Sequence, residues 1–201
     1  FRRLQGTLDA MTTVVFGTEE QAQEVAAILE RVHQRVIGPG YSANDPDLLW
    51  WVYATLIDTA LRVHARFLRP LSDGEARQFY RQSQVVAELL GVPRAHQPAD
   101  LPGFRAYMRH MVGILEVSDT ARMLSREILH PRLPRVAEPV AEPALIVFRQ
   151  LTVGLTPRPL REQYGMSWDA SRKVALLAAG VAARQVLPRI PAMFRRIPVA
   201  A

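Results

Sequence analysis

Apolar side chains recur every three or four residues along most of the chain. This spacing places them on one face of an α-helix, whereas a half-buried β-strand alternates apolar and polar residues. No stretch continues such an alternation between two hairpin turns. The pattern therefore predicts an all-α fold, a single multi-helix globular domain over residues 1–201.

Capping residues, glycines and prolines divide this pattern into separate helices. Thr18 and Gln21 form a capping box, in which two side chains satisfy free backbone N–H groups at a helix start. Ser72 and Glu75 form a second one. The expected helices extend up to residue 16 and over 18–38, 45–67, 72–91, 101–115, 118–129, 144–154 and 167–186. Four prolines within 131–143 predict an extended connection, because proline interrupts a helix.

Composition narrows the class of protein. A chain of 201 residues with 49% hydrophobic side chains can bury a substantial core in one domain. It has no cysteine, which excludes disulfides, iron–sulfur clusters and thiolate-bound haem or zinc. The longest apolar stretches, 140–148 and 174–183, are shorter than the roughly 20 residues that span a membrane. We expect a cytoplasmic protein, with peripheral membrane association as the alternative.

The net charge of +6 raises the question of an acidic partner. The positive charge is dispersed arginine, with Lys173 the only lysine, and no helix-turn-helix pattern is present. We therefore expect no nucleic-acid partner. The densest cluster is interpreted as a surface tail, with contact to an anionic membrane or polyanion as the alternative; it comprises Arg184, Arg189, Arg195 and Arg196.

His33 is the best candidate metal ligand. Ala22, Ala26, Leu29, His33 and Val36 recur at spacings of three or four, so they share one face of the expected second helix. A neutral imidazole in an apolar setting can ligate haem iron, and the small alanines leave room for a flat macrocycle. The alternative is a buried histidine that bonds a backbone carbonyl or a carboxylate.

The first helix carries a second candidate group. Arg3 and Thr7 lie one turn apart on one face, with Gly6 beside them. Glycine costs a helix about 1 kcal/mol relative to alanine, so Gly6 indicates close approach by a helix or a cofactor. Arg3 can hold a haem propionate, and Thr7 can hydrogen-bond a ligand on iron. Ordinary helix packing, with Arg3 in solvent, is the alternative.

Other chemistries find little support in the sequence. We interpret His64, His96, His110 and His130 as surface or capping residues. No two histidines have the spacing of a helical zinc or di-iron site. The chain also lacks a Gly-x-Ser-x-Gly elbow, a phosphate-binding loop and a Gly-x-Gly-x-x-Gly motif, so hydrolase, nucleotide-hydrolase and dinucleotide-binding functions are disfavoured.

Several short motifs occur in a fixed order. They are Arg3-Leu4-Gln5-Gly6-Thr7, His33-Gln34-Arg35-Val36-Ile37-Gly38, Tyr41-Ser42-Ala43-Asn44-Asp45-Pro46, Trp51-Val52, Leu90-Gly91-Val92-Pro93 and Leu151-Thr152-Val153-Gly154-Leu155. Together they resemble the family of haem-dependent oxygenases that includes the rubber oxygenases, or latex clearing proteins, and the fungal MpaB-type oxygenases. The resemblance covers nearly the whole chain, although each motif alone is weak.

The resemblance implies a haem b cofactor in a pocket between helices, with His33 as the iron ligand. It also implies that Arg3 and Thr7 contact the cofactor and take part in catalysis, and that Tyr41 contributes to cofactor binding. The expected substrates are dioxygen and a small, apolar, unsaturated molecule of isoprenoid type. The haem would carry the oxygen chemistry.

Two departures from the family pattern keep an alternative open. Rubber oxygenases have a lysine one residue before the threonine, where this chain has Gly6. The family domain also begins with further helices, one of them bearing a glutamate linked to catalysis, which we expect to lie upstream of this sequence. The alternative is a non-catalytic haem-binding or ligand-binding helical protein, and the absence of the lysine favours it.

Overall fold

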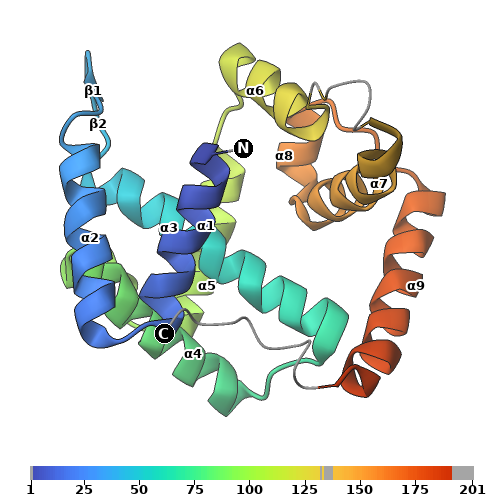
Figure 1. Ribbon diagram of the computed structural model, residues 1–201, viewed down its shortest axis with the longest axis horizontal. Helices are drawn as coiled ribbons and strands as arrows, with labels where there is room; N and C mark the ends of the chain where they lie inside the picture. Colours follow the sequence, from blue (N-terminus) through green and yellow to red (C-terminus); the bar gives the residue numbers. More distant parts are fainter. Residues whose placement is uncertain (1, 132, 134–137, 192–201) are drawn as a thin grey trace. The chain divides into compact units, whose positions relative to one another are not determined.

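The computed structural model describes residues 2–131, 133 and 138–191 (Figure 1), with the backbone alone for 2–5 and 138. The all-α prediction is confirmed. Within the described residues, the secondary structure is helical apart from two strands of two residues each. Of the expected connection over 131–143, residues 132 and 134–137 lie outside the described residues.

The chain forms two compact units. The first unit takes its described residues from Phe1–Leu61, Leu71–Arg105 and Ile190–Ala201, and the second from Arg62–Pro70 and Ala106–Arg189. Two helices, α3 (Pro46–Val63) and α5 (Leu101–Ile114), contribute residues to both units. The single domain over residues 1–201 stays a prediction.

A helical hairpin opens the first unit. Helix α1 (Arg2–Phe16) packs antiparallel to α2 (Glu19–His33), as Figure 1 shows. The capping box at Thr18 and Gln21 is confirmed, with bonds of 3.2 and 2.9 Å. Gly17 makes the turn, where a Cβ atom would lie only 2.5 Å from the carbonyl oxygen of Thr13. The hairpin therefore follows from local signals that the sequence displays.

The expected end of the second helix is wrong. Helix α2 ends at His33, and a small antiparallel hairpin follows, formed by β1 (Ile37–Gly38) and β2 (Tyr41–Ser42). Pro39 cannot donate a helical hydrogen bond, and Gly40 has φ +67°, so the pair is suited to a tight turn. The β-branched residues before them also favour a strand. A helix through residue 38 would need residues that favour a helix at these positions.

The core of the first unit lies among α3, α4 (Asp73–Leu89) and the start of α5. Trp50, Tyr80 and Phe104 are almost completely buried there, with ring centroids 5.0 Å apart for Tyr80 and Phe104. Ser72 and Glu75 cap α4 as predicted. The aromatic cluster joins three helices that are distant in sequence, so it fixes their packing.

A buried hydrogen-bond network holds the connection between α4 and α5, which includes the short 3₁₀ helix η2 (Arg94–His96). Gln84 is fully buried; its Nε2 donates to the carbonyl oxygen of Pro98 at 2.8 Å, and its Oε1 accepts from Arg94 at 2.9 Å. The Tyr80 hydroxyl donates to the same carbonyl at 2.7 Å. Every polar end of Gln84 thus has a partner, as burial requires.

The second unit consists of short and medium helices. They are the π-helix η1 (His64–Leu68), the end of α5, α6 (Asp119–Leu129), α7 (Glu138–Leu155), α8 (Arg158–Gln163), α9 (Ala170–Val186) and the 3₁₀ helix η3 (Leu187–Arg189). The expected start of a helix at 144 is wrong, because α7 already begins at Glu138. Pro143 lies in its second turn and removes only one hydrogen bond, near the end where helical bonds are fewest.

Gln163 and two helical glycines lock this unit together. Gln163 of α8 accepts from the backbone of Val117 at 2.8 Å and donates to that of Leu115 at 3.0 Å. Helix α9 packs against η1 and α7. At Gly180 a Cβ atom would lie 2.8 Å from the Arg66 carbonyl oxygen, and at Gly154 one would lie 2.5 Å from Leu176. These close approaches need glycine.

We predict opposite effects for two helical glycines in the second unit. Gly180→Ala forces backbone apart and lowers the free energy of unfolding by about 1–3 kcal/mol. Gly113→Ala in α5, where a Cβ atom meets nothing within 4 Å, keeps the folded state or stabilises it by up to about 1 kcal/mol. Urea denaturation measures both. Equal effects of the two substitutions would contradict the close packing of α9 against η1.

Candidate functional site

His33 is the last residue of α2, and its side chain is half-buried. Ala22 and Ala26 are buried at 7% and 9% exposure, so the predicted shared face does turn toward the protein. Two details differ from expectation. Val36 is 45% exposed and lies beyond the helix, and of the two alanines only Ala26 borders a cavity, whose lining does not include His33. His33 therefore lies at the C-terminal end of a helix face that packs against the protein.

The partners of the histidines distinguish them. His64 Nδ1 lies 2.6 Å from the carbonyl oxygen of Arg69, His96 Nδ1 lies 2.8 Å from the carboxylate of Asp47, and His130 Nδ1 lies 3.2 Å from Arg149. In the part of the chain that the structure describes, neither His33 nor His110 has a hydrogen-bonded ring. His110 is exposed on α5. His33 thus combines partial burial with a ring available for a ligand.

Because α1 and α2 run antiparallel, the start of α1 and the end of α2 that carries His33 lie at the same end of the helical hairpin, although the two helices diverge there in Figure 1. Thr7 is exposed on this part of α1. Gly6 has open space where its side chain would be, so the expected close approach by another helix is absent among the described residues. Arg3 lies in α1, but its side chain is outside the described part.

Tyr41 lies on the hairpin that follows His33. Tyr41 belongs to β2, where it pairs with Gly38 of β1, and its side chain is 50% exposed. The hairpin is tied to the helix end, since the Val36 carbonyl accepts from the Ala43 N–H at 3.0 Å and that of Glu30 accepts from Asn44 Nδ2 at 3.5 Å. The structure thus places Tyr41 on a segment next to His33 without a hydrogen bond between their side chains.

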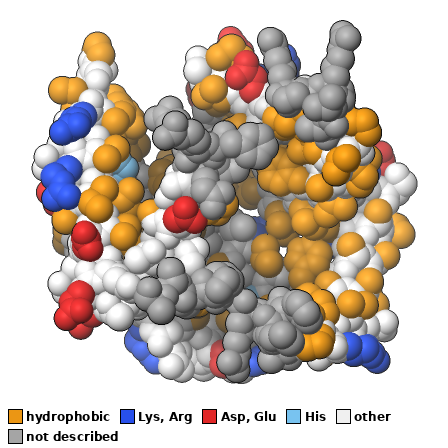
Figure 2. All heavy atoms as spheres, viewed as in Figure 1, with side chains coloured by type: hydrophobic (Ala, Val, Ile, Leu, Met, Phe, Trp, Pro, Cys, Tyr) orange, Lys and Arg blue, Asp and Glu red, His pale blue; other side chains and the backbone are white. Residues whose placement is uncertain are grey.

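Exposed aliphatic side chains surround the first unit's helices. Figure 2 shows hydrophobic side chains along the surface of α2. Exposed apolar side chains include Leu8 of α1, Ile28 and Val32 of α2, and Val52 and Leu56 of α3. They are spread over three helices, and singly exposed apolar groups are ordinary on a protein surface, so they define no binding patch by themselves.

Three helices of the first unit also line an open apolar cavity of about 480 Å³. Its wall includes Met11 and Val15 of α1, Leu56 of α3, and Phe79 and Val86 of α4. No charged side chain lines it, so it suits a neutral apolar molecule. Met11 lies one helical turn from Thr7. The sequence did not reveal this cavity, because its walls come from three separated segments.

Tyr53, Gln82 and Ser83 supply the polar part of the cavity wall. Burial raises the pKa of Tyr53 to about 12, and a hydrogen bond with Ser83 acts in the opposite direction. Ser83 in turn donates to the carbonyl oxygen of Phe79 at 2.9 Å. The phenol is therefore neutral at physiological pH, and its hydroxyl is already satisfied by the protein.

A known protein family matches this chain. The sequence model of the family described as "ER-bound oxygenase mpaB/B'/Rubber oxygenase, catalytic domain" matches residues 1–185. The chain belongs to this family. The resemblance drawn from the sequence motifs is thereby confirmed. No curated protein and no solved structure gave a significant match to this oxygenase-family chain.

Residues 2–131, 133 and 138–191 contain no group of three or more His, Asp or Glu side chains that could hold a metal ion. Haem needs only one protein ligand, because the porphyrin supplies four nitrogens. None of the described helices is long and apolar enough to cross a bilayer.

We predict that alkaline pH destabilises the fold through Tyr53. The unfolded chain releases the phenolic proton near pH 10, whereas the folded chain holds it to about 12. Stability from Tyr53 is thus complete below about pH 10 and is lost as pH rises through about 12. Urea denaturation across this range should show a shallower loss for Tyr53→Phe. An unchanged slope would contradict a buried phenol at this position.

Proposed function

We propose that this protein is a haem b-dependent oxygenase that adds dioxygen to a small, apolar, unsaturated molecule of isoprenoid type. The observation that carries the proposal is the ring of His33. It is half-buried, bonds no described residue and ends a helix in a chain of the oxygenase family. His33 would be the protein's ligand to haem iron, in the manner of a neutral imidazole.

The residues around His33 fit such a group. The aliphatic side chains of Val32 and Val36 are 52% and 45% exposed beside it, and apolar contact of this kind suits a porphyrin. Asn44 bonds the Glu30 carbonyl of α2, and Ala43 bonds the Val36 carbonyl just beyond it, so the segment on both sides of His33 is held by backbone contacts. A ligand held in place before binding loses little conformational entropy on coordination.

Further side chains have defined tasks in this proposal. When bound, haem supplies the one-electron and dioxygen chemistry. The Thr7 hydroxyl holds a proton at its Oγ1 near the end of the hairpin, where it can donate to a polar group of the reactants. Arg3 would pair with a haem propionate, and Tyr41 would offer a phenol from the strand that follows His33. The open apolar cavity beside Met11 would receive the hydrocarbon part of the substrate.

A non-catalytic haem-binding or ligand-binding role is the second candidate. Gly6 favours it, because this position carries no amine and leaves open space. The cavity would then store a ligand rather than present it for reaction. The cytoplasmic location, with peripheral membrane association as the alternative, and the absence of a nucleic-acid partner stay predictions.

The haem ligand is tested by absorption spectroscopy of the chain reconstituted with haemin. We expect a Soret band that His33→Ala abolishes or strongly shifts, because the axial nitrogen is removed. His110→Ala is the matched control and should leave the band unchanged, since His110 is exposed and its ring bonds no described residue. A band that survives His33→Ala unaltered, or one lost in His110→Ala, sinks the assignment.

Catalysis is separated from haem binding at Thr7. We expect Thr7→Val to keep the Soret band and to lower dioxygen consumption with unsaturated apolar substrates by about tenfold or more, with Ser in place of Thr restoring most of it. Oxygen-electrode assays of reconstituted protein measure this. Haem binding with no consumption by the unaltered chain would favour the non-catalytic role.

A further inference from the structure

The second unit contains a cavity that the oxygenase proposal does not use. It measures about 570 Å³, within the range of about 300–1,000 Å³ typical of small-molecule sites. It lies between the end of α6, the middle of α7 and the segment that leads into α9. Its lining residues all belong to the second unit.

Three arginines line this cavity, and no carboxylate does: Arg126, Arg149 and Arg172. Arg149 is held from two sides, by the carboxylate of Glu142 and by His130 Nδ1 at 3.2 Å. Arg172 donates to the Ser167 carbonyl oxygen at 2.7 Å and approaches the carboxylate of Asp169 at 3.7 Å. Two guanidinium groups are therefore fixed before any ligand arrives, which lowers the entropic cost of binding.

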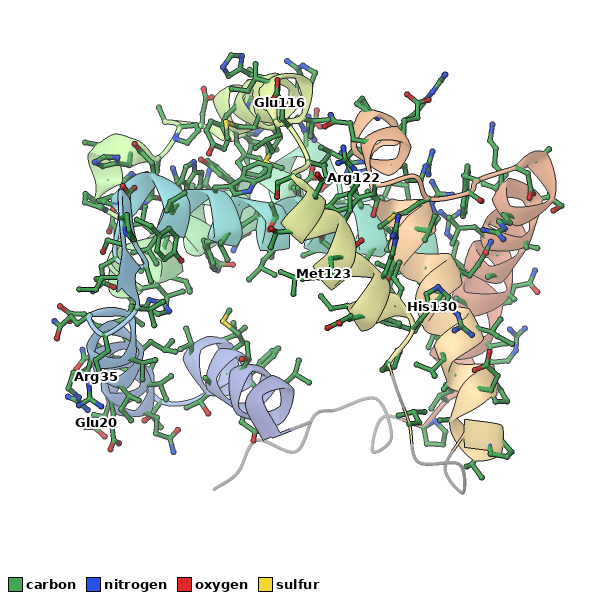
Figure 3. The ribbon with its side chains drawn as sticks, turned by 90° about the horizontal axis from the view of Figure 1, so that it is seen from above. Glu20, Arg35, Glu116, Arg122, Met123 and His130 are labelled. Atoms are coloured by element: carbon green, nitrogen blue, oxygen red, sulfur yellow. The ribbon has the colours of Figure 1, made fainter. Side chains whose placement is uncertain are left out.

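His130 adds a neutral donor. A guanidinium group has only donors, so Nδ1 of His130 must accept from Arg149 and the proton must lie on Nε2. Figure 3 shows His130 at the C-terminal end of α6, beside α7. The cavity thus offers an imidazole N–H in addition to the guanidinium groups.

The charge and the remaining lining define the ligand class. Glu142 and Asp169 offset two of the three positive charges, through Arg149 and Arg172. The guanidinium group of Arg126 has no ion pair or hydrogen bond among the described residues, so one positive charge stays uncompensated. The same cavity is lined by the aliphatic and thioether side chains of Leu129, Ile146, Val153 and Met166. This combination suits a single negative charge on an apolar body.

We propose that this cavity binds an organic acid, with its carboxylate at Arg126 and its hydrocarbon part against the α6 and α7 side chains. The bidentate geometry of a guanidinium group matches a carboxylate. The inference is independent of haem and of the proposed oxygenase activity. A doubly charged phosphate fits less well, because the net charge of the lining and its paired carboxylates is close to +1.

Calorimetric titration of the whole chain with octanoate tests the proposal. Octanol, the neutral counterpart, and inorganic phosphate, the anion without an apolar body, are titrated in parallel. We expect octanoate to bind at least about tenfold more tightly than either. Arg126→Gln should reduce octanoate affinity about tenfold and leave octanol unchanged, since one charge-assisted bond is worth that much. Arg81→Gln, an exposed arginine of α4, should change nothing.

Two further variants test the interpretation. Ile146→Glu places a negative charge in the apolar wall and should abolish octanoate binding; Ile146 is 55% exposed, so folding should survive. His33→Ala should leave octanoate affinity unchanged, which separates this site from the oxygenase proposal. Equal affinity for octanoate and octanol, phosphate binding as tight as that of octanoate, or binding insensitive to Arg126→Gln would overturn the proposal.

Discussion

The place where α2 stops determines the geometry of the candidate haem site. A helix that continued to Gly38 would carry its face on past His33 and leave Tyr41 in a loop. Pro39 and Gly40 instead form a tight turn, and the chain folds back into a two-residue hairpin. The carbonyl of Glu30 accepts the last helical hydrogen bond, from the Gln34 N–H, and a second one from the Asn44 side chain. His33 therefore lies at a helix end whose backbone is hydrogen-bonded to the segment that follows it.

The antiparallel pairing of α1 with α2 is the second consequence of local chemistry. A capped start at Thr18 and a tight approach at Gly17 return the chain along itself. The residues that the family motif marks on α1, Arg3 and Thr7, are thus on the same end of the hairpin as His33 (Figure 1). The apolar cavity begins one turn further along α1, at Met11. The candidate iron ligand His33, the hydroxyl group of Thr7 and the apolar cavity at Met11 therefore all belong to the first unit.

Features set by neighbours in sequence were predictable, and features set by distant partners were not. Both capping boxes were found because their bonds join residues three apart. The face of His33 followed from helical spacing. The contact of His96 with Asp47 joins residues 49 positions apart, and the lining of each cavity comes from three segments. The β1–β2 hairpin was not predicted because strands of two residues are too short to show alternation. The start of α7 was predicted too late because prolines near a helix start are tolerated.

The central claim is that His33 supplies the nitrogen bound to haem iron. Pulsed electron paramagnetic resonance on ferric protein, reconstituted after growth with nitrogen-isotope-labelled histidine, measures this bond directly. We predict an isotope-dependent coupling from one strongly bound histidine nitrogen, lost in His33→Ala and kept in His110→Ala. No histidine coupling in the unaltered chain, or a coupling that survives His33→Ala, would contradict the account.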